Sequence, residues 1–561
     1  MRVIPLALLF ICSCKLALPA TATQDPANVA VPYSEQEAEA GYTTGTVSTT
    51  STALYTAGAE ASGRQYVTLA PGQTVWWTAP AADTIVVRYS FPNAAGGGGL
   101  DGTLDVLSNG SMVGSLSVTS RYSWVYGTPQ WGTGNVWSPD PGQGSARHFW
   151  DESHLRLASP IAAGSTVTVR NPSSSGQTVL IDLIDFELVP AAVPAPSGSL
   201  SFASYNPDAT GASDVTGKLT QALGDAAAQG RTLYVPEGTY RIASVNVPGI
   251  TIQGAGMWRT QFVSASSGQG AQFRFNGGVT TVADLALFGN TNVRNDLSDV
   301  GNGLAGTPSS GSLVKRVWIE HMKCAWWFGT WQNAVGPTGI RVTQCRFRDT
   351  MADAVNLCSG TTMTTVDNCQ VRGTGDDGLA AWSPQTGGPV GGSNTFAHNL
   401  VQCPWVASGI ALYGGGPFVV DGNTVKDTVT SGSGLYVSAN FGAYPFTGTV
   451  DVKNNLLVRC GAHESDPGGP TGAIRVLAGD SAMNAAFLFT NNTVQTPVDS
   501  AVSIQGPDTI SGVQFNGLQA PDASVLVHVR SDASGSASFT GVTGPGSWIN
   551  DAGSAFTVSR S

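Results

Sequence analysis

Two short segments decide the fold: Val342-Thr-Gln-Cys-Arg-Phe347 and Val366-Asp-Asn-Cys-Gln-Val371. They lie 24 residues apart and place apolar residues at both ends of a central cysteine. A repeat with a period of about 20 to 50 residues is the signature of a solenoid or array. A unit this short cannot bury its apolar side alone, so consecutive units have to stack on one another.

Further units follow toward the C-terminus. Each has an asparagine beside a short apolar segment, at Asn399, Asn423, Asn455 and Asn492. A second apolar segment then begins near a glycine, as in Gly378-Leu-Ala380 and Gly434-Leu-Tyr-Val437. Stacking two short strands per unit in parallel gives one continuous core. The pattern therefore predicts a right-handed parallel β-helix over residues 201–561.

One helix is expected, over residues 213–230. Its apolar residues recur at helical spacing and it ends at a glycine, with the stripe at Val215, Leu219, Leu223 and Ala227. It comes just before the first strands of the repeat. We expect it to cap the first coil, whose open strand edges would otherwise invite pairing with another chain.

A second domain precedes the β-helix, over residues 23–190. It contains short alternating segments separated by Gly, Asn, Asp and Pro, which is typical of a β-sandwich. The expected strands are 66–69, 74–78, 84–90, 103–107, 166–169 and 179–188. A Pro- and Ala-rich linker over 191–200 joins the two domains. The fold class is thus all-β.

Composition limits the partners. In the 561 residues, 27 Lys and Arg face 38 Asp and Glu, a net charge of −11, and no basic run occurs. Such a surface repels phosphate backbones and anionic lipid, so nucleic-acid and membrane binding are not expected. Residues 1–22 resemble a secretory signal peptide cut after Ala22, which predicts a secreted, extracellular protein. We expect a monomer.

Six cysteines remain after removal of the signal peptide. They are Cys324, Cys345, Cys358, Cys369, Cys403 and Cys460. An even number in a secreted chain makes disulfides plausible. The repeat stacks Cys345 on Cys369, and this pair would either form a bridge or stay as a ladder of buried thiols.

The repeat also brings acids together. With an offset of 24, Asp353 falls beside Asp377, and Asp376 adds a third carboxyl group. Neighbouring strands lie about 4.8 Å apart, so the three acids should form one patch. Glycines at 375 and 378 are expected to supply the conformational freedom that exposes both Asp376 and Asp377 to solvent.

Crowded carboxylates cannot all ionise at the usual cost, so one should stay protonated as a general acid while another acts as base. This division is what hydrolysis of a glycosidic bond requires. The alternative is a set of calcium ligands or solvated turn residues. Aromatic residues on the same face, Trp382, Tyr413 and Tyr436, are candidates for stacking on sugar rings.

The two acid-bearing segments, Asp349-Thr-Met-Ala-Asp353-Ala-Val-Asn-Leu357 and Gly373-Thr-Gly-Asp376-Asp377-Gly378, resemble glycoside hydrolase family 87, the α-1,3-glucanases and mycodextranases. Segments 119–127 and 147–152 resemble the sandwich that precedes the β-helix of that family. The resemblance implies endo-hydrolysis of α-1,3-glucosidic bonds with inversion. Asp376 would be the general acid, and Asp353 and Asp377 would hold and deprotonate water, with acid and base about 6.5–9.5 Å apart.

Several alternatives stay open. The substrate could be the alternating α-1,3/α-1,4 glucan of mycodextranases or another polysaccharide such as dextran, and a non-catalytic glycan-binding β-helix is a different class. A lyase is disfavoured because we expect no basic residues around the triad. No cofactor is needed for catalysis. A structural calcium in the sandwich, which resembles carbohydrate-binding modules, would use Glu60 and Asp182.

Overall fold

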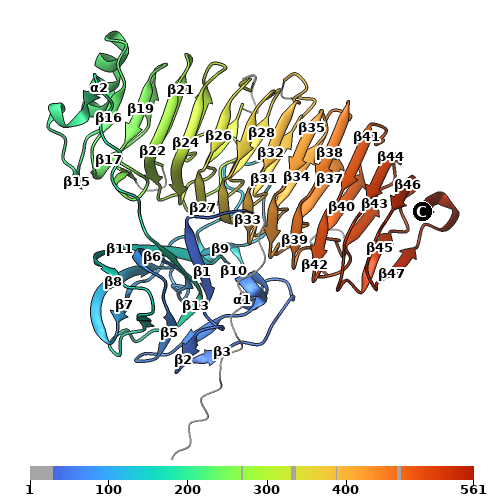
Figure 1. The fold of residues 1–561 in the computed structure, drawn as a ribbon, viewed down its shortest axis with the longest axis horizontal. Helices are drawn as coiled ribbons and strands as arrows, with labels where there is room; N and C mark the ends of the chain where they lie inside the picture. Colours follow the sequence, from blue (N-terminus) through green and yellow to red (C-terminus); the bar gives the residue numbers. More distant parts are fainter. Residues whose placement is uncertain (1–28, 267–269, 330–335, 387, 464–468) are drawn as a thin grey trace, which may run out of the picture.

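The computed structural model describes residues 29–266, 270–329, 336–386, 388–463 and 469–561. The chain forms a long stack of β-coils with a second β-rich domain packed beneath its first half (Figure 1). This confirms the predicted fold class, an all-β protein with a β-sandwich followed by a right-handed parallel β-helix. The predicted signal peptide lies outside the described residues.

The N-terminal domain packs two antiparallel sheets around an apolar core. One sheet contains β1 (Tyr33–Glu37), β3 (Thr46–Val47), β4 (Val67–Leu69), β6 (Ala82–Ser90), β11 (Asp151–Ile161) and β13 (Val179–Glu187). The other contains β2 (Tyr42–Thr43), β5 (Thr74–Thr78), β7 (Asp101–Ser108), β8 (Ser111–Thr119) and β12 (Thr166–Arg170). A short hairpin of β9 (Trp124–Tyr126) and β10 (Ala146–His148), and the helix α1 (Ala57–Glu60), complete the domain. The six strands expected from the sequence are all present, within a few residues of the expected ends.

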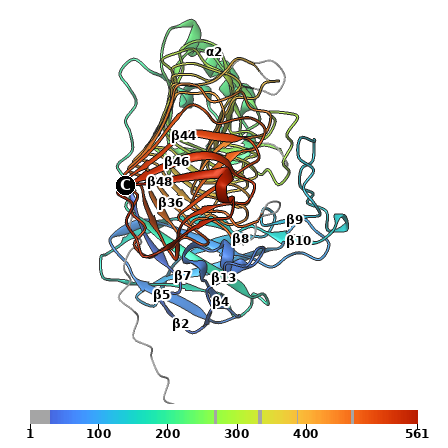
Figure 2. The ribbon, with the colours of Figure 1, turned by 90° about the vertical axis from the view of Figure 1, so that its right-hand side faces the viewer.

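The β-helix has two parallel sheets in the described residues. The longer one runs through β14 (Leu200–Ser201), β15 (Thr210–Asp214), β16 (Leu233–Val235), β17 (Gly238–Ile242), β19 (Thr251–Gly254), β20 (Thr260–Ser264), β22 (Thr281–Phe288), β24 (Leu313–Glu320), β26 (Arg341–Thr343), β27 (Arg346–Thr350), β29 (Thr365–Asp367), β30 (Gln370–Thr374), β32 (Asn394–Ala397), β33 (Leu400–Gln402), β35 (Phe418–Asp421), β36 (Thr424–Lys426), β38 (Thr449–Lys453), β39 (Leu456–Val458), β41 (Ala486–Thr490), β42 (Thr493–Gln495), β44 (Thr509–Asn516), β46 (Ser534–Thr540) and β48 (Phe556–Arg560). The shorter one runs through β18 (Val245–Val247), β21 (Phe273–Asn276), β23 (Leu304–Thr307), β25 (Trp326–Phe328), β28 (Val355–Cys358), β31 (Leu379–Trp382), β34 (Ile410–Tyr413), β37 (Leu435–Ala439), β40 (Ile474–Ala478), β43 (Val502–Gln505), β45 (Val525–Val529) and β47 (Ser547–Asn550). Figure 2 looks toward the end of this stack.

The register confirms the repeat that was read from the sequence. Val342 pairs with Val366 across β26 and β29, and Phe347 pairs with Val371 across β27 and β30. Their side chains belong to one continuous core that also contains Cys345 and Cys369. The 24-residue offset therefore equals one coil.

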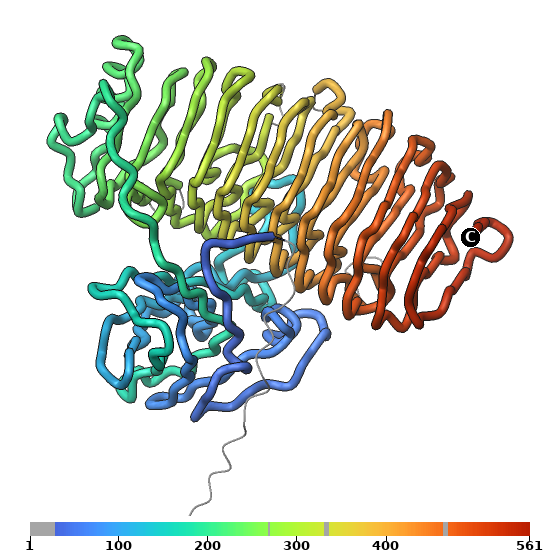
Figure 3. The backbone as a smooth tube through the Cα atoms, in the orientation of Figure 1, coloured from blue at the N-terminus to red at the C-terminus, as the bar shows by residue number. Residues whose placement is uncertain are grey.

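The capping helix is α2 (Thr216–Ala228). It buries Leu219, Ala222, Leu223 and Ala226 against the first coil, and Ala227 is only half-buried. The helix begins later than expected because residues 210–214 form the strand β15. Figure 3 traces the segment that leads from the sandwich to this capped end of the stack.

A ladder of buried asparagines runs down one corner of the β-helix. Asn399 donates its side-chain amide to Oδ1 of Asn423 at 3.0 Å, and Asn423 donates to Asn455 at 2.9 Å. Asn455 in turn donates to Asn492 at 2.9 Å. Each amide also donates to a backbone carbonyl, as Asn423 does to Phe396 at 2.9 Å. The ladder thus satisfies polar groups that the corner would otherwise bury without partners.

Replacing Asn423 by Ala should lower the free energy of unfolding by about 3 kcal/mol, because several buried groups of neighbouring coils lose their hydrogen-bond partner. Urea unfolding followed by circular dichroism measures this change. Asn246→Ala, at an exposed position of β18, is the matched control and should change stability by less than about 0.5 kcal/mol. Equal stability of the two variants would contradict a structural role for the ladder.

The six cysteines form no disulfide in the structure. All are free and buried, and Cys345 and Cys369 stack as thiols. The backbone N–H of Cys369 donates to Oδ1 of Asn399 at 2.9 Å, so the two cysteines continue the corner occupied by the asparagines. Of the two alternatives for this pair, the thiol ladder is the one observed, and the expectation of disulfides is wrong.

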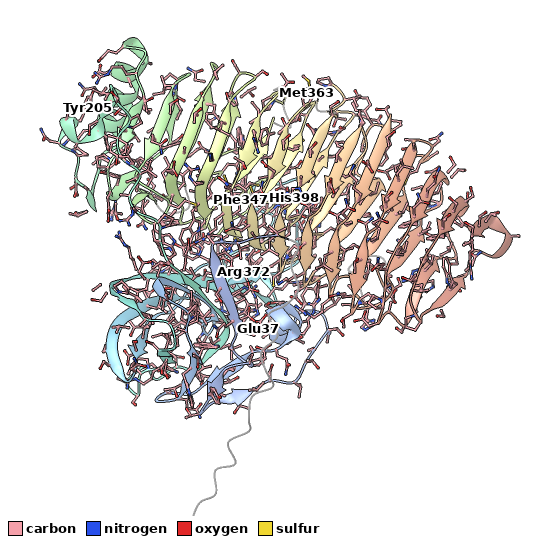
Figure 4. All side chains as sticks on the ribbon, in the orientation of Figure 1. Glu37, Tyr205, Phe347, Met363, Arg372 and His398 are labelled. Atoms are coloured by element: carbon pink, nitrogen blue, oxygen red, sulfur yellow. The ribbon has the colours of Figure 1, made fainter. Side chains whose placement is uncertain are left out.

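The two domains meet through buried ion pairs. Arg372 of β30, fully buried, contacts Asp185 and Glu35 of the sandwich at 2.5 Å and 2.9 Å, and it also pairs with Glu152. Arg346 pairs with Glu187 at 2.8 Å. Figure 4 labels Arg372 where the stack faces the sandwich. The sandwich is therefore fixed to the β-helix by charges that would be costly to leave unpaired.

Candidate active site

The three predicted acids lie together at one turn of two neighbouring coils. Asp353 lies between β27 and β28, and Asp376 and Asp377 lie at the equivalent turn between β30 and β31. One oxygen of each carboxyl group lies within 4.8 Å of the others. The two turns are built alike, because Thr350 donates to the carbonyl of Ala352 at 2.7 Å and Thr374 donates to that of Asp376 at 2.8 Å.

The acids differ in exposure and in partners. Asp353 and Asp377 are only 3% and 4% exposed, whereas the side chain of Asp376 is 21% exposed. Asp377 accepts hydrogen bonds from the backbone N–H of Ser408 and from the hydroxyl group of Tyr413, both at 2.8 Å. The expectation that Asp376 and Asp377 both reach solvent is therefore wrong for Asp377.

Burial and mutual repulsion shift two of the carboxyl groups. Burial, together with the charge of Asp376, raises the pKa of Asp353 to about 8. The same causes raise the pKa of Asp377 well above its ordinary value. Crowding and burial therefore shift the pKa of carboxyl groups in this patch, as the sequence predicted, and the raised values fall on the two buried acids.

The flanking glycines have a different role from the one expected. Neither Gly375 nor Gly378 has a positive φ. A Cβ at Gly375 would collide with the backbone of Met351, and one at Gly378 would collide with Val401 and the backbone of Gly409. Glycine is thus required at both positions because adjacent coils approach closely there, and not because the backbone needs conformational freedom.

A basic residue that sequence reasoning missed contacts the triad. Arg294, in the segment between β22 and β23, donates from Nη1 to Oδ2 of Asp376 at 2.5 Å and from Nε to Asp296 at 2.8 Å. It is 4% exposed. The expectation of no basic neighbour is therefore wrong. Arg294 belongs to a long segment between β22 and β23, whereas the turns that carry the acids are short, so the 24-residue offset could not place it beside Asp376.

The guanidinium group of Arg294 is also evidence against the alternative in which the three acids are calcium ligands. Three convergent carboxylate oxygens suit a divalent cation by their spacing alone. Arg294 already brings a positive charge into contact with one of the three. A cation among these oxygens would be repelled by it. The arrangement therefore favours acid–base chemistry.

Comparisons with known proteins identify the family of this chain. The α-1,3-glucanase catalytic domain D1 matches residues 30–189, and the α-1,3-glucanase catalytic domain D2 matches residues 211–524, more than half of the chain. The chain belongs to glycoside hydrolase family 87. It is thus an α-1,3-glucanase-type glycoside hydrolase, as the acid-bearing segments predicted. No curated protein matches the chain.

Solved structures of this family are similar over nearly the whole chain. The catalytic unit of a thermostable α-1,3-glucanase from Streptomyces thermodiastaticus strain HF3-3 is 33% identical, with a TM-score of 0.83, and the match covers 95% of this chain and 97% of that one. The Agl-KA catalytic domain is 25% identical, with a TM-score of 0.86 and coverage of 98% and 100%. A family 87 α-1,3-glucanase catalytic domain in complex with nigerose shares the fold at 24% identity, with a TM-score of 0.80 and coverage of 95% and 98%.

The predicted aromatic residues do share the outer face of the shorter sheet. Trp382 pairs in register with Tyr413, and Tyr436 lies edge-on to Tyr413 with ring centroids 5.6 Å apart. They form one cluster beside the triad. Tyr413 and Tyr436 are only 7% and 6% exposed, and Trp382 is half-buried. The two tyrosines are therefore almost fully covered, and the open aromatic surface is smaller than the sequence predicted.

The two calcium candidates of this family 87 chain lie in the sandwich with other partners. Glu60 accepts from His148 at 2.7 Å, and Asp182 is paired with Arg88. Both acids are fully buried. Neither belongs to a group of three metal-ligating side chains within the described parts of the chain. Arg88 also donates to the carbonyl of Glu60 at 3.3 Å, so a guanidinium lies where a cation between the two acids would lie.

Another acidic group, which sequence reasoning did not single out, lies between the domains. Asp151 of the sandwich accepts from Nε2 of His321 at 2.7 Å, and Asp349 lies near both. Burial opposes the charge on the imidazole, but Asp151, together with Glu320 and Asp349, outweighs the effect of burial and raises the pKa of His321 to about 10. The pair is thus a charged contact that adds to the interface.

Proposed function

We propose that this family 87 hydrolase is a secreted, monomeric enzyme that cleaves α-1,3-glucan internally and inverts the anomeric centre. The observation that carries the proposal is the carboxyl triad at equivalent turns of two adjacent coils. The predicted signal peptide at 1–22 supports secretion. N-terminal sequencing of exported protein should find Thr23 as the first residue.

Asp376 is our candidate for the general acid, since it is the most exposed of the three and can reach a glycosidic oxygen. Asp353 and Asp377 would hold and deprotonate the water. Arg294 contacts Oδ2 of Asp376. We expect the glycosidic oxygen to take this place, because a general acid has to lie within hydrogen-bond distance of the atom that it protonates.

Inversion has to be tested directly, because the spacing of the acids does not support it. The nearest oxygens lie within 4.8 Å of one another. That is shorter than the predicted acid–base separation and closer to the spacing of about 5–5.5 Å typical of retaining enzymes. The proposal rests on the family resemblance and on the presence of two acids that can share one water.

The position of the triad supports internal cleavage. Strands β28 and β31 are the fifth and sixth of the twelve strands of the shorter sheet. Further coils therefore extend on both sides of the acids, so a chain lying across them need not end there. Trp382, Tyr413 and Tyr436 are proposed to contact the sugar rings on one of these sides.

Parallel incubation with α-1,3-glucan, nigeran and dextran, following product size and anomeric form, tests the proposal. Early release of oligosaccharides of mixed length from α-1,3-glucan alone, with the anomeric form opposite to that of the substrate, is expected. Cleavage of nigeran alone would establish the mycodextranase alternative, and cleavage of dextran alone a dextranase. Binding without release of reducing sugar would favour the non-catalytic alternative.

The triad also predicts a pH dependence. The pKa of Asp353, a proposed base, is raised to about 8, so this carboxyl group keeps its proton below that pH and can accept one from water above it. We expect kcat/KM to rise as the pH rises toward about 8. Arg294 lowers the pKa of Asp353, so Arg294→Gln should move this rise to higher pH. Arg341→Gln, an exposed control, should leave it in place, and an unchanged pH dependence in Arg294→Gln would contradict the assignment of Asp353 as a base.

A further inference from the structure

A loop of the sandwich crosses to the active site. It connects β9 to β10 and bonds to the segment that carries Arg294. The backbone N–H of Val136 donates to the carbonyl of Arg294 at 2.9 Å. Asp296 donates its N–H to the carbonyl of Thr133 at 2.9 Å and accepts from the N–H of Gly132 at 3.1 Å. Figure 2 shows this blue-green connection rising from β9 and β10 alongside the stack.

The loop is also held by apolar packing. Trp137 and Phe149 of the sandwich are buried against Met351, Trp405 and Val429 of the β-helix. Met351 lies two residues from Asp353. The loop is thus fixed by a small interdomain core and by three hydrogen bonds, two between backbone groups and one to the side chain of Asp296. It can present a side chain in a defined place.

Trp131 is the side chain that this loop presents. It is 49% exposed. Its ring packs edge-on against Trp137, with centroids 6.1 Å apart, and the guanidinium of Arg294 lies over it at 4.9 Å from the centroid. A single side chain, that of Arg294, therefore separates this indole from Asp376. About half of the Trp131 surface is therefore exposed to water beside the proposed catalytic acids. Covering this apolar area with a ligand would be favourable.

We propose that Trp131 is a sugar-binding subsite that the sandwich contributes to the active site. Its ligand is a glucose ring of a neutral α-glucan, whose apolar C–H face would cover the exposed part of the indole. The subsite rests on the proposed function. It would make the sandwich part of the catalytic unit. A rigid aromatic anchor of this kind gives contact area at little cost in side-chain entropy.

Kinetics of Trp131→Ala on α-1,3-linked oligosaccharides of four to eight glucose units test the subsite. KM should rise about tenfold for the chains long enough to reach it, with kcat nearly unchanged, because the contact binds substrate and transition state alike. Trp131→Phe should recover most of the affinity. Met112→Ala, which removes another exposed apolar side chain of the sandwich on β8, should leave KM unchanged.

A binding measurement separates this inference from the proposed function. In an Asp376→Asn background, calorimetric titration with the longest oligosaccharide should give a Kd about tenfold weaker when Trp131 is also Ala, equivalent to about 1.4 kcal/mol. If wild-type protein hydrolyses α-1,3-glucan and Trp131→Ala changes neither KM nor Kd, the subsite is wrong and the function stands. If wild-type protein binds the oligosaccharide without cleaving it, the function is wrong and the subsite is still tested by Kd.

Trp131 has one purely structural alternative, namely that it only supports Arg294. In that case Trp131→Ala would shift the pH dependence of kcat/KM toward that of Arg294→Gln and leave KM and Kd unaltered. This outcome would overturn the subsite. Unchanged pH dependence with a raised KM is the pattern that the subsite predicts.

Discussion

Replacement of Asp376 by Asn is expected to lower kcat on α-1,3-glucan by about 10²- to 10⁴-fold, the usual contribution of a positioned general acid. Asn is nearly isosteric and can keep a contact with Arg294, but it cannot deliver a proton to the leaving oxygen. Release of reducing sugar measures the rate. Binding of oligosaccharides should be largely preserved, because the change removes chemistry and leaves the neighbouring surface intact.

Two controls accompany this variant. Asp532→Asn, at an exposed position far along the chain, should retain the wild-type rate. Asp377→Asn should also lose activity, since its carboxyl group is held by Ser408 and Tyr413 next to the proposed water. Full activity of Asp376→Asn would contradict its assignment as the general acid. Equal losses in Asp376→Asn and Asp377→Asn would mean that the carboxyl groups act as one coupled unit.

Replacement of Arg372 by Met should destabilise the protein by about 3–5 kcal/mol, the cost of breaking a buried ion pair from one side. Arg372 is the shared partner of Glu35, Glu152 and Asp185, all on the sandwich. Its removal leaves these carboxylates buried with less positive charge. Urea unfolding followed by tryptophan fluorescence measures the loss.

The control is Arg341→Met, which breaks an exposed ion pair with Asp367 and should cost at most about 1 kcal/mol. Arg372→Lys keeps the charge but not the planar fork, so an intermediate loss is expected. Should Arg372→Met not accumulate in soluble form, the lysine variant still reports on the network. Stability of both variants within about 1 kcal/mol of wild type would show that the ion pairs of Arg372 contribute little to the stability of the protein.

Much of the fold followed from the 24-residue offset. A parallel coil pairs each residue with its counterpart one repeat later, so Val342 lies beside Val366 and Asp353 falls at the turn equivalent to that of Asp377. The aromatic residues were placed on the correct face for the same reason, because strand residues alternate between faces. The burial of Tyr413 and Tyr436 does not follow from strand alternation, because it depends on neighbouring loops.

Local periodicity and the register between adjacent repeats are enough to predict the β-helix, its capping helix, the β-sandwich and the meeting of three acids. The burial of Asp353 and Asp377, the contact of Arg294 with Asp376 and the approach of Trp131 became visible only in the folded chain. These last features come from irregular excursions and from the docking of one domain on the other. No period relates such segments to the strands, so their positions depend on packing among residues far apart in the chain.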